Sequence, residues 1–364
     1  MRKIKQITLT LFIFVTIVVF SVMGKTVSES VKSSLELCFF AVIPSLFPFF
    51  ILSEFLMQIV SCASKRVTVT AFATGLLTGF PAGVNNVCRL YEQKTIDKST
   101  ATSLLYCTAN ASPAYVVTFI GTHIIKSKQA GVALLIAQII TAFACAVFFR
   151  CFKNTESKSC GVIHISEAIS KAITSSVINC LYVCGYIVLF GILADIVSGF
   201  TGVIVNARIK SIIIGAIEIT RGMETIDFRE NGAIVTAAII LGFSGISVIM
   251  QCINCAIKAG LSPKPIITGK LIYTFIMPGI AYIIYKLMPK ASNNTFKGSE
   301  NIWSVITVIA FLLLCVVAIY NIFDKSKEKL YNREKITERT NDIFKRYNTN
   351  VSLLRARQKN HDNR

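Results

Sequence analysis

Long apolar runs with almost no charged residues constrain this chain more than any other feature. Ile7–Met23, Ala130–Phe149 and Ile302–Tyr320 each approach the ~20 residues that a helix needs to cross about 30 Å of hydrocarbon. Charged residues make up 16% of the 364 positions, whereas a soluble domain carries about a quarter. A single water-soluble core cannot bury so many uncharged runs, so the sequence predicts an all-α polytopic membrane protein.

Hydropathy, read together with the short basic loops, predicts about eight transmembrane helices. Two glycine-punctuated segments, Thr70–Lys94 and Ile204–Arg229, are too short or too polar to cross twice as ordinary helices. We expect each to form a re-entrant hairpin, because irregular backbone survives at membrane depth where protein or a water-filled cavity satisfies it. The alternative, that one or both cross the membrane outright, stays open. The predicted helices span residues 7–23, 36–60, 99–125, 129–150, 168–198, 232–257, 265–288 and 302–323.

The first apolar run follows three basic residues, Arg2, Lys3 and Lys5, as it does in a signal peptide. The run is longer than the apolar region of a signal peptide, and no small-x-small cleavage site follows clearly, so we expect a retained anchor. The predicted segments are an N-terminal anchor helix (1–28), a first repeat (29–150), a second repeat (165–290), a C-terminal transmembrane helix (300–323) and a basic cytoplasmic tail (324–364).

The formal net charge of +19 comes from basic residues in short loops and in the tail after Asp324. This distribution is typical of residues that set membrane topology, and it predicts that both termini lie in the cytoplasm. It is not the pattern of a folded basic domain. We therefore expect the lipid bilayer as a partner and no nucleic acid.

Internal similarity divides the chain into two halves that share the order of helix breaker, carboxylate, glycine cluster and Asn/Ser cluster. The offset is about 141 residues for the first pair of segments, and each half contains one span, one hairpin and two more spans. An odd number of spans predicts opposite orientations, which makes an inverted internal repeat. Chance similarity between apolar segments is the alternative. The paired segments are Pro44–Glu54 with Gly185–Asp195, Gly75–Gly83 with Gly215–Gly222, and Thr108–Pro113 with Gly242–Ser247.

Polar residues at predicted membrane depth are the candidates for a solute site, because broken helices turn backbone groups and helix ends toward a cavity. A surface loop, a proline kink and a structural pair of Arg221 with Glu218 or Glu224 are the structural alternatives. Glu54 and Asp195 are candidates for coupling, or else lie at helix ends beside water. The substrate-binding candidates are Gly79, Pro81, Gly83, Asn85, Asn110, Ser112, Glu218, Thr220, Arg221, Gly222 and Ser244.

Most of the twelve cysteines lie in apolar runs, where a thiol packs as a small hydrophobic group. Cys252 and Cys255 have the spacing of a redox or metal pair, but they fall on a predicted membrane helix with no histidine nearby in sequence. No catalytic triad, phosphate-binding loop or metal-ligand spacing is present in the sequence. We therefore expect no enzyme activity, no metal and no other cofactor.

Five segments between residues 30 and 290 resemble the sporulation integral membrane protein YlbJ family, whose members carry two nucleoside-recognition "Gate" domains. The resemblance implies that the two repeats are Gate-like, and that the protein lies in the outer forespore membrane of a spore-forming bacterium. It further implies transport of dipicolinic acid from the mother cell toward the forespore. Arg221 stands where the family usually has an amide. The resembling segments are Val42–Glu54, Thr78–Gly83, Tyr106–Pro113, Glu218–Gly222 and Leu241–Ser247.

The leading hypothesis is a transporter that binds a small anionic solute between the hairpins and the broken helices. Arg221 would orient the anion through its planar fork of donors. One alternative, which is not a transporter, is a membrane scaffold or assembly factor that binds partners through the basic tail. Another alternative is a nucleoside-type carrier. Assembly into a homo-oligomer stays open.

Overall fold

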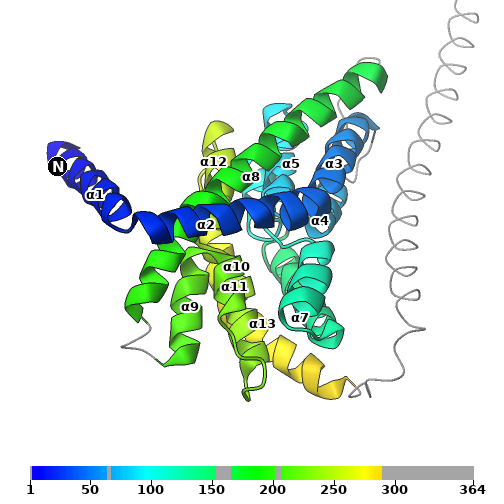
Figure 1. Ribbon diagram of the computed structural model, residues 1–364. Helices are drawn as coiled ribbons and strands as arrows, with labels where there is room; N and C mark the ends of the chain where they lie inside the picture. The colour runs from blue at the N-terminus through cyan, green and yellow to red at the C-terminus, as the bar shows by residue number, and fades with distance from the viewer. Residues whose placement is uncertain (1, 64–66, 153–164, 202–205, 289–364) are drawn as a thin grey trace, which may run out of the picture. The chain divides into compact units, whose positions relative to one another are not determined.

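The computed structural model describes residues 2–63, 67–152, 165–201 and 206–288, and every regular element within these ranges is a helix. The predicted C-terminal transmembrane helix (300–323) and the basic tail (324–364) lie outside the described residues. The N-terminal apolar run forms α1 (Arg2–Val22). Figure 1 shows how the helices are arranged.

Five helical stretches in the described part of the chain are long and apolar enough to cross a membrane. Large hydrophobic side chains such as Phe40, Phe148 and Phe275 are more than three-quarters exposed on their surfaces, which fits contact with lipid rather than water. The architecture is therefore that of an all-α membrane-embedded protein. The five stretches are Gly24–Ile59, Lys128–Phe148 (α7), Ile165–Thr201 (α8), Ala233–Lys258 and Lys264–Leu287 (α13).

Four of the predicted spans, 129–150, 168–198, 232–257 and 265–288, agree with these stretches to within a few residues. The predicted span 36–60 begins earlier in the structure, at Gly24. There α2 (Gly24–Leu37), the π-helical η1 (Cys38–Val42) and α3 (Ile43–Ala63) follow one another without a break. The total of eight spans stays a prediction.

Two long helical stretches, α2–η1–α3 and α8, pack against each other and cross in Figure 1. Their contact is a small apolar cluster that includes Val42, Leu46, Val183 and Ile187. Gly191 on α8 makes close approach possible, because a Cβ atom there would lie 2.7 Å from Ser34 Oγ. The two long helices thus form a common support for the shorter elements.

The segments predicted as hairpins are each built from two short helices. α4 (Val67–Thr78) and α5 (Ala82–Glu92) have 12 and 11 residues, so each is about 16–18 Å long and covers roughly half of the hydrocarbon thickness. α9 (Ala207–Ile217) also has 11 residues, and α10 (Ile219–Glu224) has only 6. No single helix of either pair can therefore cross a bilayer alone.

Two further stretches are interrupted in the middle, and both interruptions lie beside a hairpin. The predicted span 99–125 consists of α6 (Lys98–Leu105) and the π-helical η2 (Ala114–Ile124), with irregular backbone over 106–113. α11 (Ala233–Phe243) and α12 (Gly245–Lys258) are separated at Ser244, whose φ of 69° is left-handed. Such breaks leave backbone groups that need partners from outside the helix.

Candidate functional site

Each hairpin tip lies against the broken helix of its own half of the chain. At the first tip, Phe80 N donates to Asn110 O over 2.6 Å, and a Cβ atom on Gly79 would lie 2.6 Å from Ser112 N. At the second tip, a Cβ atom on Gly245 would lie 3.1 Å from Ile219 N. Glycine is required where backbones approach this closely, and Gly79 and Gly245 also have positive φ.

A small central cavity of about 30 Å³ lies between the two hairpin tips and the two long helices. Phe80 lines it from the first tip, and Glu218 and Thr220 line it from the second. Tyr115 Oη lies 2.9 Å from Thr220 Oγ1, which joins η2 to the second hairpin. The remaining lining residues are Val42, Leu46, Ser112, Val183, Ile187, Ile219, Ser247, Val248 and Gln251.

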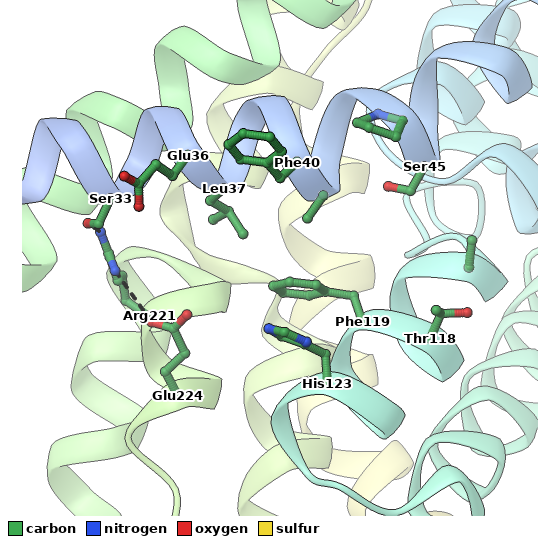
Figure 2. Close-up of a pocket in the computed structure, with 13 residues that line it drawn as sticks. Ser33, Glu36, Leu37, Phe40, Ser45, Thr118, Phe119, His123, Arg221 and Glu224 are labelled. Carbon is green, nitrogen blue, oxygen red and sulfur yellow. Dashed lines mark hydrogen bonds and ion pairs between the residues drawn. The ribbon is translucent and has the colours of Figure 1, made fainter.

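A larger cavity of about 650 Å³, here called the vestibule, adjoins this region between α2–η1–α3, η2 and α10. Its lining residues include Ala41, Ala114 and Arg221, which directly neighbour Val42, Tyr115 and Thr220 of the central cavity in sequence. Figure 2 shows Arg221, Phe119 and His123 facing the vestibule. Its other lining residues are Ser33, Glu36, Leu37, Phe40, Pro44, Ser45, Thr118 and Glu224.

Three aromatic side chains form a stacked row along η2 from the central cavity into the vestibule. The ring centroids of Tyr115 and Phe119 are 5.5 Å apart with an interplanar angle of 23°, and those of Phe119 and His123 are 5.7 Å apart with 18°. Offset stacks of this kind present flat apolar faces and polar edges. A planar aromatic solute would find a matching surface here.

Arg221 is tied to several groups at the edge of the vestibule. Its guanidinium lies 3.5 Å from Asp195 and 3.4 Å from Glu224, and it donates to Ser34 Oγ over 3.3 Å and also to Ser33 Oγ. Its side chain is 15% exposed. The structural pair with Glu224 is therefore present, while Glu218 accepts the backbone N–H of Arg221 over 2.8 Å instead of pairing with its guanidinium.

A second arginine forms a comparable cluster on the first hairpin. Arg89 on α5 forms an ion pair with Glu54 on α3 and donates to Ser175 Oγ on α8 over 2.6 Å. Asn85 donates to the other oxygen of Glu54 over 3.1 Å. The buried carboxylate of Glu54 thus has charged and neutral partners, as a carboxylate at membrane depth requires.

The predicted site residues fall into separate groups rather than one. Ser112, Glu218 and Thr220 line the central cavity, Arg221 lines the vestibule with Asp195 as its ion-pair partner, and Asn85 and Glu54 belong to the Arg89 cluster. The binding and coupling roles of these residues stay predictions.

The other predicted site residues shape the backbone around the tips. Asn110 is fully buried and donates to Cys107 O over 2.7 Å, and Ser244 marks the break between α11 and α12. A Cβ atom on Gly83 would lie 2.7 Å from Gly75 Cα, so the two helices of the first hairpin touch through glycine. The predicted residues of this kind are Gly79, Pro81, Gly83, Asn110, Gly222 and Ser244.

Sequence reasoning missed several polar residues that complete the site. Gln138 on α7 donates to Ala111 O over 2.9 Å and accepts from Ala111 N over 3.1 Å, and so bridges the first break. Lys270 on α13 is 4% exposed and donates to Ser244 Oγ over 2.8 Å at the second break. A lone polar residue within an apolar run was the available signal for both.

Comparison of the chain with protein-family models, with curated proteins and with solved structures gave no match.

Proposed function

We propose that this protein is a carrier of a small anionic solute, built from two related halves that face opposite sides of the membrane. The central cavity is the main support for the proposal, because four of its lining residues form two pairs from the two halves. Val42 and Val183 are separated by 141 positions, as are Leu46 and Ile187. A cavity lined by equivalent residues of both halves lies where an internal two-fold axis would pass, and transporters with inverted repeats bind their solutes there.

The surface cavities support the same relationship. A groove of about 630 Å³ on α8 has lining residues that repeat those of the vestibule at the offset of 141. The vestibule on one half and the groove on the other would then be the two approaches to the central cavity. The pairs are Leu37 with Ile178, Phe40 with Leu181, Ala41 with Tyr182, Pro44 with Gly185, and Ser45 with Tyr186.

The lining of the vestibule favours a planar aromatic anion. The stacked Phe119 and His123 rings offer a flat surface, and the Arg221 guanidinium offers donors that match a carboxylate. Dipicolinic acid, an aromatic dicarboxylate, combines both features. Together with the resemblance to the YlbJ family, this leads us to propose dipicolinate transport toward the forespore during sporulation, in the outer forespore membrane.

Uptake of radiolabelled dipicolinate into proteoliposomes tests this function. We expect saturable uptake by the full-length protein, and a loss of about tenfold or more in Arg221→Gln, since one charge-assisted pair contributes about 1.5–3 kcal/mol. Arg229→Gln is the matched control, because that arginine is 96% exposed. Uptake that is unchanged in Arg221→Gln would reject the anion site, and stronger competition by nucleosides than by unlabelled dipicolinate would favour a nucleoside carrier.

A further inference from the structure

We propose that the central cavity binds a small monovalent cation, held by oxygen atoms of Glu218, Gln251 and the neighbouring serines. This deepens the proposed function, on which it rests, by naming the ion that would accompany the anionic solute. The cavity and the vestibule would then hold opposite charges in adjoining sites.

The size of the cavity limits what it can hold. Its volume of about 30 Å³ exceeds the ~10–15 Å³ needed for one water-sized particle. It is far too small for an aromatic dicarboxylate, so the solute proposed for the vestibule cannot be its occupant without a conformational change. A single small ion fits.

The chemistry of the lining selects a cation. Glu218, which is 2% exposed, contributes a carboxylate, and Ser112 and Ser247 contribute hydroxyl groups. No lysine, arginine or histidine is among the lining residues. Oxygen ligands of this kind suit hard cations, whereas the carboxylate would repel an anion.

Gln251 supplies an independent observation. It lines the cavity, it is 4% exposed, and its Oε1 atom has no hydrogen-bond partner among the described residues. Its amide nitrogen lies 3.5 Å from Ser247 Oγ, whereas its carbonyl oxygen has no such neighbour among the described residues. A buried carbonyl without a partner is destabilising, and a cation in the cavity would supply the missing partner.

The charges around the cavity leave a negative excess. The Arg221 guanidinium pairs with Asp195 and Glu224, while Glu218 accepts backbone N–H groups of Thr220 and Arg221. Three carboxylates therefore lie around one guanidinium, and Glu218 is the one that is buried. A buried carboxylate without a cationic partner of its own is costly at membrane depth. Lys270 is not among the lining residues, and its ammonium donates to Ser244 Oγ.

We expect binding at the central cavity and at the vestibule to be coupled, because the two sites are lined by adjacent residues. Thr220 lines the central cavity, and the next residue, Arg221, lines the vestibule. A cation beside Glu218 would reduce the negative potential felt by an anion near Arg221, and the anion would favour the cation equally. Each ligand should therefore raise the affinity for the other.

Cation binding to the purified full-length protein in detergent tests the proposal. The probe is sodium chloride added to a choline chloride buffer at constant ionic strength, with radiolabelled sodium binding and the midpoint of thermal unfolding as readouts. A second arm lowers the pH in choline buffer. Protonation of the Glu218 carboxylate alone would also stabilise the fold, so only a pH response that weakens in Gln251→Leu counts as occupancy of the cavity by a cation. The ionisable groups that interact with Glu218 from its own and neighbouring elements are Cys38, Tyr115, Arg221 and Glu224.

We expect saturable stabilisation by sodium or by protons, with affinity about tenfold or more weaker in Gln251→Leu and in Glu218→Gln. Gln251→Leu keeps the test informative if Glu218→Gln does not fold. Glu167→Gln, on the exposed surface of α8, is the control and should respond like wild type. No response to either cation, or wild-type responses in both cavity variants, would overturn the cation site.

The cation-binding and uptake experiments together distinguish failure of the cation site from failure of the proposed transport function. Cation binding without dipicolinate uptake would reject the solute and leave the cation site in place. Uptake that is independent of sodium and of pH would leave the carrier in place and reject the cation site.

Discussion

Arg89 on α5 forms an ion pair with the buried carboxylate of Glu54 on α3. The same guanidinium donates to Ser175 Oγ on α8, so one side chain of the first hairpin is tied to both long helical stretches. A planar fork of donors can make such contacts in two directions at once.

The second hairpin is tied to the long helices by the same chemistry. Arg221 on α10 pairs with Asp195 on α8 and donates to Ser34 on α2. Asp195 lies 141 positions after Glu54, and Ser175 lies 141 positions after Ser34. The hairpin arginine of each half therefore makes two equivalent contacts. It pairs with the carboxylate on the long helical stretch of its own half, and it donates to a serine on the long helical stretch of the other half.

Removal of Arg89 should destabilise the protein through the charge left behind. Arg89→Ala leaves Glu54, which is 2% exposed, without its cationic partner. Breaking a buried pair costs about 3–5 kcal/mol, and partial exposure of the arginine reduces this to about 2 kcal/mol. Thermal unfolding in detergent measures the effect. Arg229→Ala, which removes an exposed pair with Asp227, should change the midpoint little, and equal effects of the two variants would contradict this account.

The glycines of the hairpins should not tolerate a methyl group. A Cβ atom on Gly222 would overlap the backbone of Gly215, so Gly222→Ala must separate α9 from α10. Overpacking of this kind costs about 1–3 kcal/mol, and we expect a lower unfolding midpoint together with lost uptake. Gly199→Ala on α8 is the control, because a Cβ atom there meets no atom within 4 Å. If Gly222→Ala unfolded at the wild-type temperature, the close packing of the hairpin would be in error.

Hydropathy was sufficient to predict the helical class and the positions of most long helices. An apolar run as long as the one that forms α7 is expected to be a helix in lipid, because a helix makes its backbone hydrogen bonds within itself. The breaks were also visible locally, since Asn110 and Pro113 interrupt one run and Gly242 and Gly245 interrupt another. Local sequence therefore predicts where helices stop.

The partners of the polar residues could not be predicted from the sequence. The sequence offers Arg221 either for an anion or for a structural pair with Glu218 or Glu224, but it does not indicate the contacts with Asp195 and with serines almost 190 positions away. Such contacts depend on how the two long helices cross, which no short segment specifies. The role of Gln138 could not be predicted for the same reason, because its partner Ala111 lies in the irregular segment between α6 and η2.

Gln138 should be essential for the first break. In Gln138→Leu, the N–H and the carbonyl of Ala111 lose their partners, and each buried backbone group left unpaired costs about 1–3 kcal/mol. We expect destabilisation of about 2 kcal/mol or more by thermal unfolding. Ile139→Leu, on the exposed side of the same helix, should be neutral. Stability that is unchanged in Gln138→Leu would show that water or another group replaces the bridge.

The proposed opposite orientation of the two halves predicts which side of the membrane equivalent residues face. Glu29 on α2 and Ser170 on α8 are both exposed, and they are separated by 141 positions. If the halves are inverted, these equivalent positions lie on opposite sides of the bilayer. The basic residues Arg150 and Lys153 predict, by the positive-inside rule, that the start of α8 faces the cytoplasm.

Single cysteines at these two positions test the orientation directly, after the twelve native cysteines are replaced. A membrane-impermeant maleimide should label Glu29→Cys in intact cells and Ser170→Cys only in inverted vesicles. A permeant maleimide that labels both variants in either preparation controls for burial. Labelling of both cysteines from the same side would mean that the halves are parallel, and the paired lining of the central cavity would then need another explanation.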